Sequence, residues 1–109
     1  MKVLNYGSLN VDYVYSVDHI IVGGETQHSS KLEVFSGGKG LNQSIALAKA
    51  GVPVYHAGIV GTDGDILLEA CKEAGVNTKY IRRLPVKGGH TMIQVDKNAQ
   101  NCIILYGGT

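Results

Sequence analysis

The glycines of this chain stand at the ends of its apolar runs, and this placement limits the folds that the chain can adopt. There are 15 glycines among the 109 residues, about twice the ~7% of average usage. They occur singly or in pairs and form neither a repeat nor a linker. Glycine at the end of an apolar segment is typical of tight turns and helix termini. The pattern therefore predicts a globular α/β protein with many short elements.

The apolar periodicity between these glycines predicts the individual elements. Apolar residues at helical spacing predict two helices, each followed by a glycine, over residues 41–50 and 65–74. Runs rich in β-branched and aromatic residues predict strands over 2–6, 11–17, 28–35, 54–60, 79–83, 90–96 and 101–106. A mixed sheet with helices packed on it fits this order. The last two strands and the 11–35 segment could form a separate small antiparallel sheet.

Charge, hydropathy and cysteine content exclude several classes of protein. The 10 basic and 9 acidic residues give a net charge of +1, which does not favour a polyanionic partner such as nucleic acid. No apolar run approaches the ~20 residues of a membrane-spanning helix. The two cysteines, Cys71 and Cys102, lie among apolar neighbours and are expected to be reduced core thiols. We therefore expect a cytoplasmic protein that binds neither nucleic acid nor membrane.

The loop Gly37-Gly38-Lys39-Gly40 directly precedes the helix expected at 41–50. Glycines let backbone N–H groups approach a ligand closely, and the first turn of a helix has unpaired N–H donors. A phosphate-binding P-loop needs Ser or Thr after its lysine, but Gly40 follows Lys39. A dinucleotide fingerprint that starts at Gly38 needs glycine where Gln43 stands. A ligand-binding loop and a tight turn without a ligand are therefore equally good interpretations.

Polar residues after the first strand and at the helix start are further candidates for binding a ligand. Asn10 and Asp12 follow the strand expected at 2–6, and ligands of open α/β sheets bind beyond the carboxyl ends of strands. The Asp12 carboxylate could accept hydrogen bonds from a polyol, although a turn residue without a ligand is the simpler interpretation. Asn42, near the helix start, is by itself a local cap or a solvated side chain.

The turn from Gly61 to Asp65 invites a metal-binding interpretation. It lacks the downstream glutamate of a calcium loop, so an N-cap for the helix at 65–74 is the favoured role. The 4 histidines have no spacing typical of metal ligands, and the 2 cysteines form no CxxC pair. The sequence therefore predicts no metal site in this chain.

Several motifs together resemble the N-terminal portion of the ribokinase-like (PfkB-type) carbohydrate kinases. The most specific motif is the glycine loop with the helix start that follows it, Gly-Gly-Lys-Gly-Leu-Asn-Gln-Ser at 37–44. The others are Gly-Ser-Leu-Asn-Val-Asp at 7–12, Gly-Glu-Thr at 24–26, Val-Gly-Thr-Asp-Gly at 60–64 and Ala-Gly-Val at 74–76. The resemblance covers essentially the whole chain, in order and without large gaps.

The resemblance implies an α/β fold that combines part of a Rossmann-like domain with a small β-sheet lid. Core segments are expected at about 1–10 and 36–87, and lid strands at about 11–35 and 88–106. Enzymes of this family transfer the γ-phosphoryl group of ATP, with Mg2+, to a sugar hydroxyl. The chain is therefore expected to belong to an ATP-dependent sugar kinase, with ribose as the first candidate substrate and a homodimer formed through the lid.

The resemblance also assigns roles to single residues of this sequence. The residues expected to bind the sugar are Asn10, Asp12, Gly38, Lys39 and Asn42. The lid residues expected to cover it are Thr91, Ile93 and Leu105.

One expected part of the family is absent from this sequence. The family's catalytic aspartate lies in a Gly-Ala-Gly-Asp motif of the C-terminal half, together with most of the ATP site, and nothing in the 109 residues matches it. This chain is therefore expected to hold no catalytic residue and to be inactive alone. The alternatives are a relative that phosphorylates a ketohexose or a nucleoside, and a non-catalytic, truncated sugar-binding or dimerisation module.

Overall fold

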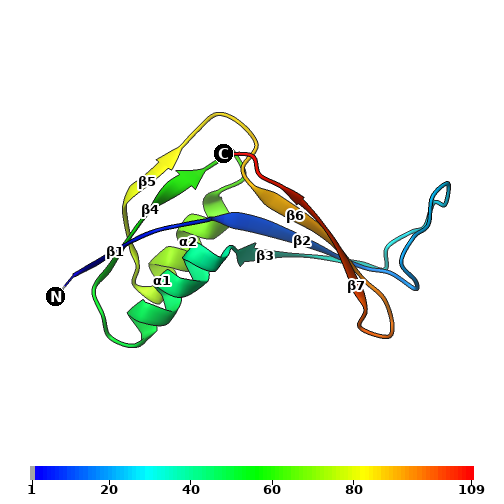
Figure 1. Cartoon of the computed structure of the whole chain (residues 1–109), viewed down its shortest axis with the longest axis horizontal. Helices are drawn as coiled ribbons and strands as arrows, with labels where there is room; N and C mark the ends of the chain where they lie inside the picture. The colour runs from blue at the N-terminus through cyan, green and yellow to red at the C-terminus, as the bar shows by residue number, and fades with distance from the viewer. Residues whose placement is uncertain (1) are drawn as a thin grey trace.

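The computed structural model describes residues 2–109, which form an elongated molecule with two sheets placed end to end (Figure 1). One sheet has three strands in the order β1-β4-β5, and the other has four in the order β3-β2-β6-β7. The elements are, in chain order, β1 (Val3–Tyr6), β2 (Asn10–Ser16), β3 (Lys31–Gly37), α1 (Lys39–Lys49), β4 (Val54–Val60), α2 (Asp65–Ala74), β5 (Asn77–Arg83), β6 (His90–Val95) and β7 (Asn101–Tyr106).

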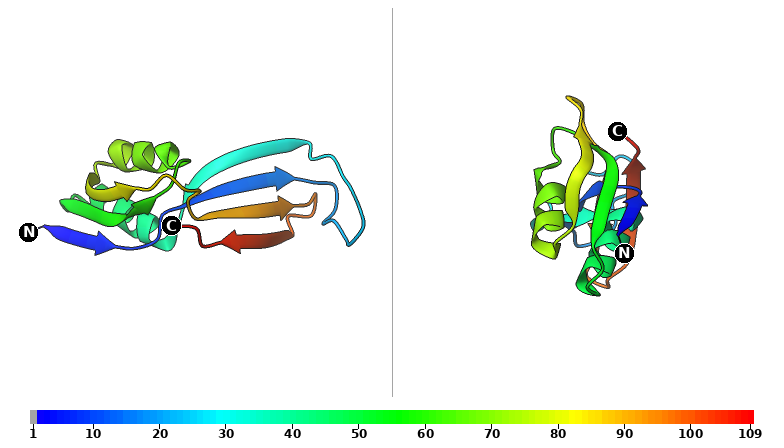
Figure 2. Two further views of the ribbon diagram at one scale, coloured as in Figure 1. Left: turned by 90° about the horizontal axis from the view of Figure 1, so that it is seen from above. Right: turned by 90° about the vertical axis from the view of Figure 1, so that its left-hand side faces the viewer.

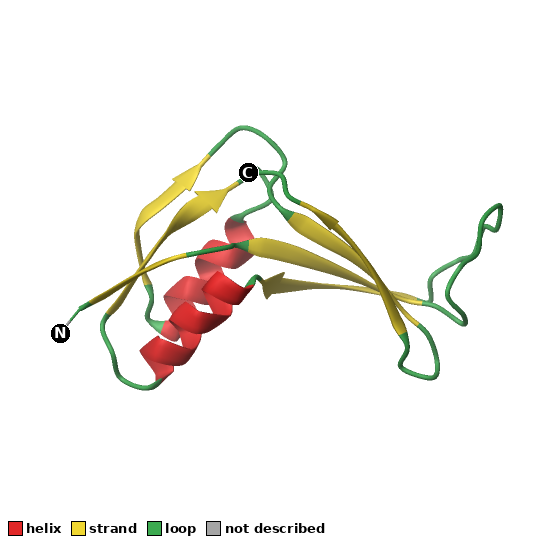
Figure 3. Cartoon of the chain, viewed as in Figure 1, coloured by secondary structure: helices red, strands yellow, loops and turns green. Residues whose placement is uncertain are grey.

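The three-stranded sheet is entirely parallel, and both helices lie on the same face of it (Figure 3). Their buried side chains Leu41, Leu67 and Cys71 form one apolar core with Val54 and Val60 of β4. Burial of such side chains is the main force that holds helices on a sheet. The predicted mixed sheet under the helices is therefore wrong in this detail. A helix precedes both β4 and β5, and such long connections allow the chain to return for parallel pairing.

Among residues 2–109, no helix lies on the opposite face of the three-stranded sheet (Figure 2). Leu4 and Tyr6 of β1 point to this face and are 63% and 81% exposed.

None of the helices described in residues 2–109 combines the length and apolar character that crossing a membrane requires.

Local sequence signals placed the helices and the central strand accurately. The observed bounds of α2 and β4 are those predicted, while α1 begins two residues earlier than expected, at Lys39. Gly51 and Gly75 follow the helices with φ of +87° and +84°, a left-handed conformation that costs glycine little. The glycine stop signals in the sequence are therefore confirmed.

The four-stranded sheet is mixed rather than antiparallel. The β2–β3 and β6–β7 pairs are antiparallel, but β2 and β6 pair in parallel. The chain between them passes through both helices and the other sheet, and such a long connection imposes no antiparallel pairing. The separate sheet predicted from the sequence therefore exists, but with one parallel pair.

Strand β3 ends two residues later than predicted because of its partner. It pairs with β2 from Lys31, opposite Ser16, to Gly37, opposite Asn10. Pairing thus extends the strand into the glycine loop, where a single-sequence pattern predicts only a turn.

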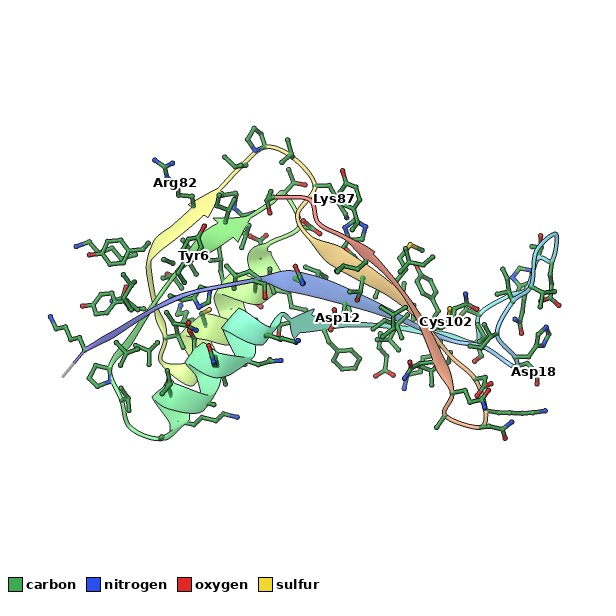
Figure 4. All side chains as sticks on the ribbon, in the orientation of Figure 1. Tyr6, Asp12, Asp18, Arg82, Lys87 and Cys102 are labelled. Carbon is green, nitrogen blue, oxygen red and sulfur yellow. The ribbon has the colours of Figure 1, made fainter. Side chains whose placement is uncertain are left out.

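The two cysteines lie in different environments. Cys71 of α2 is buried, as predicted, and burial raises the pKa of its thiol. Cys102 lies on β7, an edge strand whose residues are all exposed, and Figure 4 shows it on that strand. The prediction of a core thiol at Cys102 is therefore wrong, because its apolar neighbours in sequence are themselves exposed on β7.

Candidate functional site

A row of side chains crosses one face of the four-stranded sheet at the level of Asp12. Asp12 of β2 lies opposite Phe35 of β3 and Thr91 of β6, and Thr91 lies opposite Leu105 of β7. Residues directly opposite each other in a sheet share a face. The Thr91 hydroxyl donates a hydrogen bond of 2.7 Å to Asp12 Oδ1, across 79 residues of sequence. The carboxylate is therefore fixed through one of its two oxygens.

Two glycines make room for the polar side chains of β2. A Cβ atom added at Gly37 would lie 2.5 Å from Asp12 Oδ2, and one added at Gly89 would lie 2.5 Å from Asn10 Oδ1. Both distances are far below van der Waals contact, so only glycine leaves these side chains where they are. Within residues 2–109, no hydrogen bond reaches Asp12 Oδ2. The second oxygen can therefore accept a hydrogen bond from a ligand.

The glycine loop packs directly on the β1–β2 turn. Ser8 accepts hydrogen bonds from two of the first amides of α1. Its carbonyl oxygen accepts one from Leu41 N (3.0 Å), and its hydroxyl oxygen accepts one from Gly40 N (3.3 Å). Gly38 has φ of +102°, and a Cβ there would lie 2.5 Å from the Ser8 carbonyl oxygen. The glycines thus serve a close backbone contact, and the amides of Gly40 and Leu41 are not free to bind a phosphate.

The structure brings some of the predicted site residues together. Asp12 lies close to Gly37, and Asn10 N lies 3.2 Å from the position of a Cβ on Gly38. Figure 4 shows Asp12 beside the start of α1. Lys39 and Asn42 are exposed on the first turn of that helix, and their side chains form no hydrogen bond or ion pair with the other residues described.

The predicted lid residues share the face of Asp12. Thr91 contacts the carboxylate directly, and Leu105 lies beyond Thr91 in the same row. Ile93 lies one row further along, opposite Val14 and Ile103. Pairing between strands far apart in sequence thus places these side chains on one surface.

Sequence patterns did not single out three polar side chains beneath the β1–β2 turn. Asn5, Ser44 and His56 come from β1, α1 and β4, and they are joined by hydrogen bonds. One signal could have revealed them: each interrupts an apolar pattern at a position expected to face the core. Because a buried polar group without a partner is costly, such interruptions indicate a hydrogen-bonded cluster.

Asp63 holds the segment that leads into β6. Its Oδ1 accepts a hydrogen bond from Gly88 N (3.0 Å), and its Oδ2 lies 3.5 Å from Lys87 Nζ. No side chain caps α2, whose N-cap is Gly64, so the predicted capping role of this turn is wrong. Burial raises the pKa of Asp63, but the Gly88 amide, its own amide and Lys87 together bring that pKa below the ordinary 3.8. The charged form is therefore favoured by folding.

This lowered pKa predicts how stability depends on pH. Asp63 stabilises the fold fully above 3.8, the value for the unfolded chain, and this contribution is lost as the pH falls through the lower pKa of the folded state. We expect Asp63→Asn to reduce the free energy of unfolding by about 1 kcal/mol at neutral pH. The difference from the wild type should shrink below pH 3.8.

Urea unfolding across a pH series measures this difference. The control is Asp65→Asn, whose carboxylate is solvent-exposed and pairs with Arg83. A difference between Asp63→Asn and the wild type that stays constant down to the acid end of the series contradicts the prediction.

The described residues hold no evident metal centre. Within residues 2–109, no three His, Cys, Asp or Glu side chains gather in an arrangement that could hold a metal ion.

Comparison with known proteins relates the chain to kinases of ribose. It is 40% identical to a ribokinase of Staphylococcus aureus (strain COL) over 111 aligned residues, which cover 98% of this chain and 36% of the relative. A ribokinase structure from Cryptococcus neoformans in complex with ADP matches with a TM-score of 0.91 and 36% identity, over 98% of this chain and 34% of that one. A ribokinase structure from Arabidopsis thaliana complexed with ribose and ATP matches with a TM-score of 0.87 and 32% identity, over 98% of this chain and 36% of that one.

These matches confirm the α/β fold expected from the sequence. The structure builds this fold from a parallel sheet joined to a mixed one. The chain spans about a third of the length of the relatives that it matches. The family model described as pfkB family carbohydrate kinase matches residues 1–109, the whole of this sequence. The chain therefore belongs to the pfkB family of carbohydrate kinases, and within it resembles the ribokinases.

Proposed function

We propose that the full-length protein transfers the γ-phosphoryl group of ATP to a hydroxyl group of a small sugar, with ribose as the first candidate. The observation that carries this proposal is the Asp12 carboxylate. Thr91 orients one of its oxygens, and the other accepts no hydrogen bond within the described residues. Family membership and the likeness to a ribokinase complexed with ribose and ATP support the reaction and the substrate.

Each proposed sugar-binding residue has a chemical role. Asp12 accepts hydrogen bonds from sugar hydroxyls, and a charged acceptor makes such bonds about twice as strong as neutral ones. The Asn10 amide can donate and accept, which suits a hydroxyl group. Gly38 has no side chain, so the sugar can approach the backbone of the loop closely. Lys39 and Asn42 supply donors from the exposed first turn of α1.

In the same proposal the four-stranded sheet is a lid over the sugar, with Thr91, Ile93 and Leu105 on its inner face. Their shared face with Asp12 supports this role. A closed lid excludes water, which otherwise competes with the sugar as phosphoryl acceptor. ATP, bound with Mg2+, supplies the phosphoryl group. The chain described here contributes the sugar-binding side of the reaction.

Substitution of Asp12 tests the sugar site. We expect Asp12→Ala in the full-length protein to weaken ribose binding by about a hundredfold, equivalent to one strong hydrogen bond to a charged group, and to leave ATP binding unchanged. Isothermal titration calorimetry measures both affinities. Gly37→Ala is the matched variant, because it keeps the carboxylate but puts a methyl group 2.5 Å from its Oδ2. Ribose affinity equal to that of the wild type in both variants contradicts the assignment of Asp12.

The same protein distinguishes the alternative functions. Titration with ribose, 2-deoxyribose, fructose and adenosine separates a ribose kinase from a kinase of ketohexoses or nucleosides. Sugar-dependent formation of ADP separates a kinase from a non-catalytic sugar-binding module. Tight sugar binding without ADP formation overturns the proposed reaction and retains the binding site.

We also propose a homodimer formed through the four-stranded sheet. This proposal rests on the family resemblance, and the exposed apolar side chains Ile103 and Leu105 on the Asp12 face support it. We expect wild-type protein to sediment as a dimer and Ile103→Asp to sediment as a monomer. Leu84→Ser, at an exposed leucine outside this sheet, is the control that stays dimeric. A monomeric wild type contradicts the proposal.

A further inference from the structure

Three polar side chains form a chain of hydrogen bonds between β1, α1 and β4. Asn5 Nδ2 lies 2.9 Å from Ser44 Oγ, and Ser44 Oγ lies 2.6 Å from His56 Nδ1. Ser44 and His56 are 0% exposed. Their neighbours on β4 and α1 include the core residues Val54, Val60 and Leu41. A polar chain in such an apolar setting is retained only if its groups are all paired.

The chain ends on two backbone carbonyls. His56 Nε2 donates to Gly7 O (3.0 Å), and Asn5 Nδ2 also donates to Gly40 O (2.9 Å). Because a carbonyl oxygen only accepts, His56 Nε2 carries the ring hydrogen. His56 Nδ1 then accepts from the Ser44 hydroxyl, whose oxygen accepts from Asn5. Every bond is satisfied by a neutral imidazole.

The two carbonyls belong to the two segments that bear the proposed sugar ligands. Gly7 lies in the turn that leads to Asn10, and Gly40 follows Gly38 and Lys39 on the glycine loop. The two backbones touch here, since a Cβ on Gly40 would lie 2.6 Å from Gly7 Cα. The hydrogen-bonded chain thus joins both segments to β4, the central strand of its sheet.

We infer that the Asn5–Ser44–His56 chain positions the sugar site by holding the β1–β2 turn against the start of α1. His56 is therefore a positioning residue, which acts through Gly7 and does not touch the sugar. The inference rests on the proposed sugar-binding role of Asn10 and Asp12. Displacement of a binding group by about 1 Å can cost up to a hundredfold in rate, so loss of this chain should be felt at the site.

Variants of the full-length protein test this role. His56→Leu removes both ring bonds, Ser44→Ala removes the middle of the chain, and His56→Gln keeps an N–H donor near the position of Nε2. We expect His56→Leu and Ser44→Ala to raise the KM for ribose about tenfold, with the KM for ATP unchanged. His56→Gln should restore most of the ribose affinity. Because His56→Leu is the harshest change, Ser44→Ala and His56→Gln keep the test valid if it fails to fold.

A second measurement does not depend on the sugar. The Leu41 amide donates to Ser8 O across the contact that the chain supports, so its hydrogen exchange should be faster in His56→Leu and Ser44→Ala. Asp12→Ala should leave this exchange unchanged. Lower melting temperatures with unchanged ribose KM and unchanged Leu41 exchange indicate a purely structural chain and overturn the inference. Faster Leu41 exchange with normal ribose binding in both Ser44→Ala and Asp12→Ala instead overturns the proposed sugar site, and with it the positioning of that site.

Discussion

Gly40→Ala is expected to lower the free energy of unfolding by about 3 kcal/mol, the upper end of the cost of overpacking. Helix propensity alone argues for the opposite sign, because alanine is favoured over glycine by about 1 kcal/mol inside a helix. The Gly40 Cβ would, however, lie 2.5 Å from both Gly7 C and Ser8 N. These are backbone atoms that cannot rotate away, so α1 and the β1–β2 turn must separate. The contact therefore outweighs the propensity.

The same change should abolish the hydrogen bonds of Ser8 to the first amides of α1. Denaturant unfolding measures the stability, and hydrogen exchange at Leu41 measures the loosened contact. Gly23→Ala is the control, since nothing lies within 4 Å of a Cβ at that exposed glycine. A Gly40→Ala protein as stable as the wild type, or more stable, shows that the backbones are further apart than described.

Leu41, the next residue, must be large, whereas Gly40 must have no side chain. Leu41 is 0% exposed and belongs to the core between α1 and the sheet. We expect Leu41→Ala to reduce the free energy of unfolding by about 3 kcal/mol, because lost apolar transfer and the cavity left behind both contribute. A small change here would mean that the neighbouring side chains collapse into the space.

Leu84→Ala is the matched control for this prediction. Leu84 is 38% exposed, so its truncation removes fewer contacts and leaves no closed cavity. We expect its free energy of unfolding to fall by less than about 1 kcal/mol. Equal losses in the two variants, measured by thermal or urea unfolding, contradict the assignment of Leu41 to the core.

Elements with local signals could be predicted from the sequence. Helix α2 and strand β4 have the predicted bounds, because a glycine stop and an apolar run are read within a few residues. The predicted bounds of β3 are wrong, because the end of this strand depends on its pairing with β2. The prediction that Cys102 is buried is wrong, because its exposure depends on whether another element covers β7.

The candidate site divides in the same way. The motifs at 7–12 and 37–44 identify the residues proposed to bind sugar through their resemblance to the family. That resemblance proposed Thr91 for the lid, but its bond to Asp12 rests on a parallel pairing between β2 and β6 across the whole α/β segment. The cluster of Asn5, Ser44 and His56 had no motif, since its members come from separate elements.

The family, the α/β class and the glycines that end both helices can be predicted from the sequence, because they depend on short motifs and on periodicity along the chain. Tertiary structure alone decided that Ser8 occupies the first amides of α1, that Gly37 makes room for the Asp12 carboxylate, and that His56 holds the β1–β2 turn. Each of these relations joins segments that meet only after the sheets have formed. Contacts of that kind depend on three-dimensional distance, which no local pattern of residues encodes.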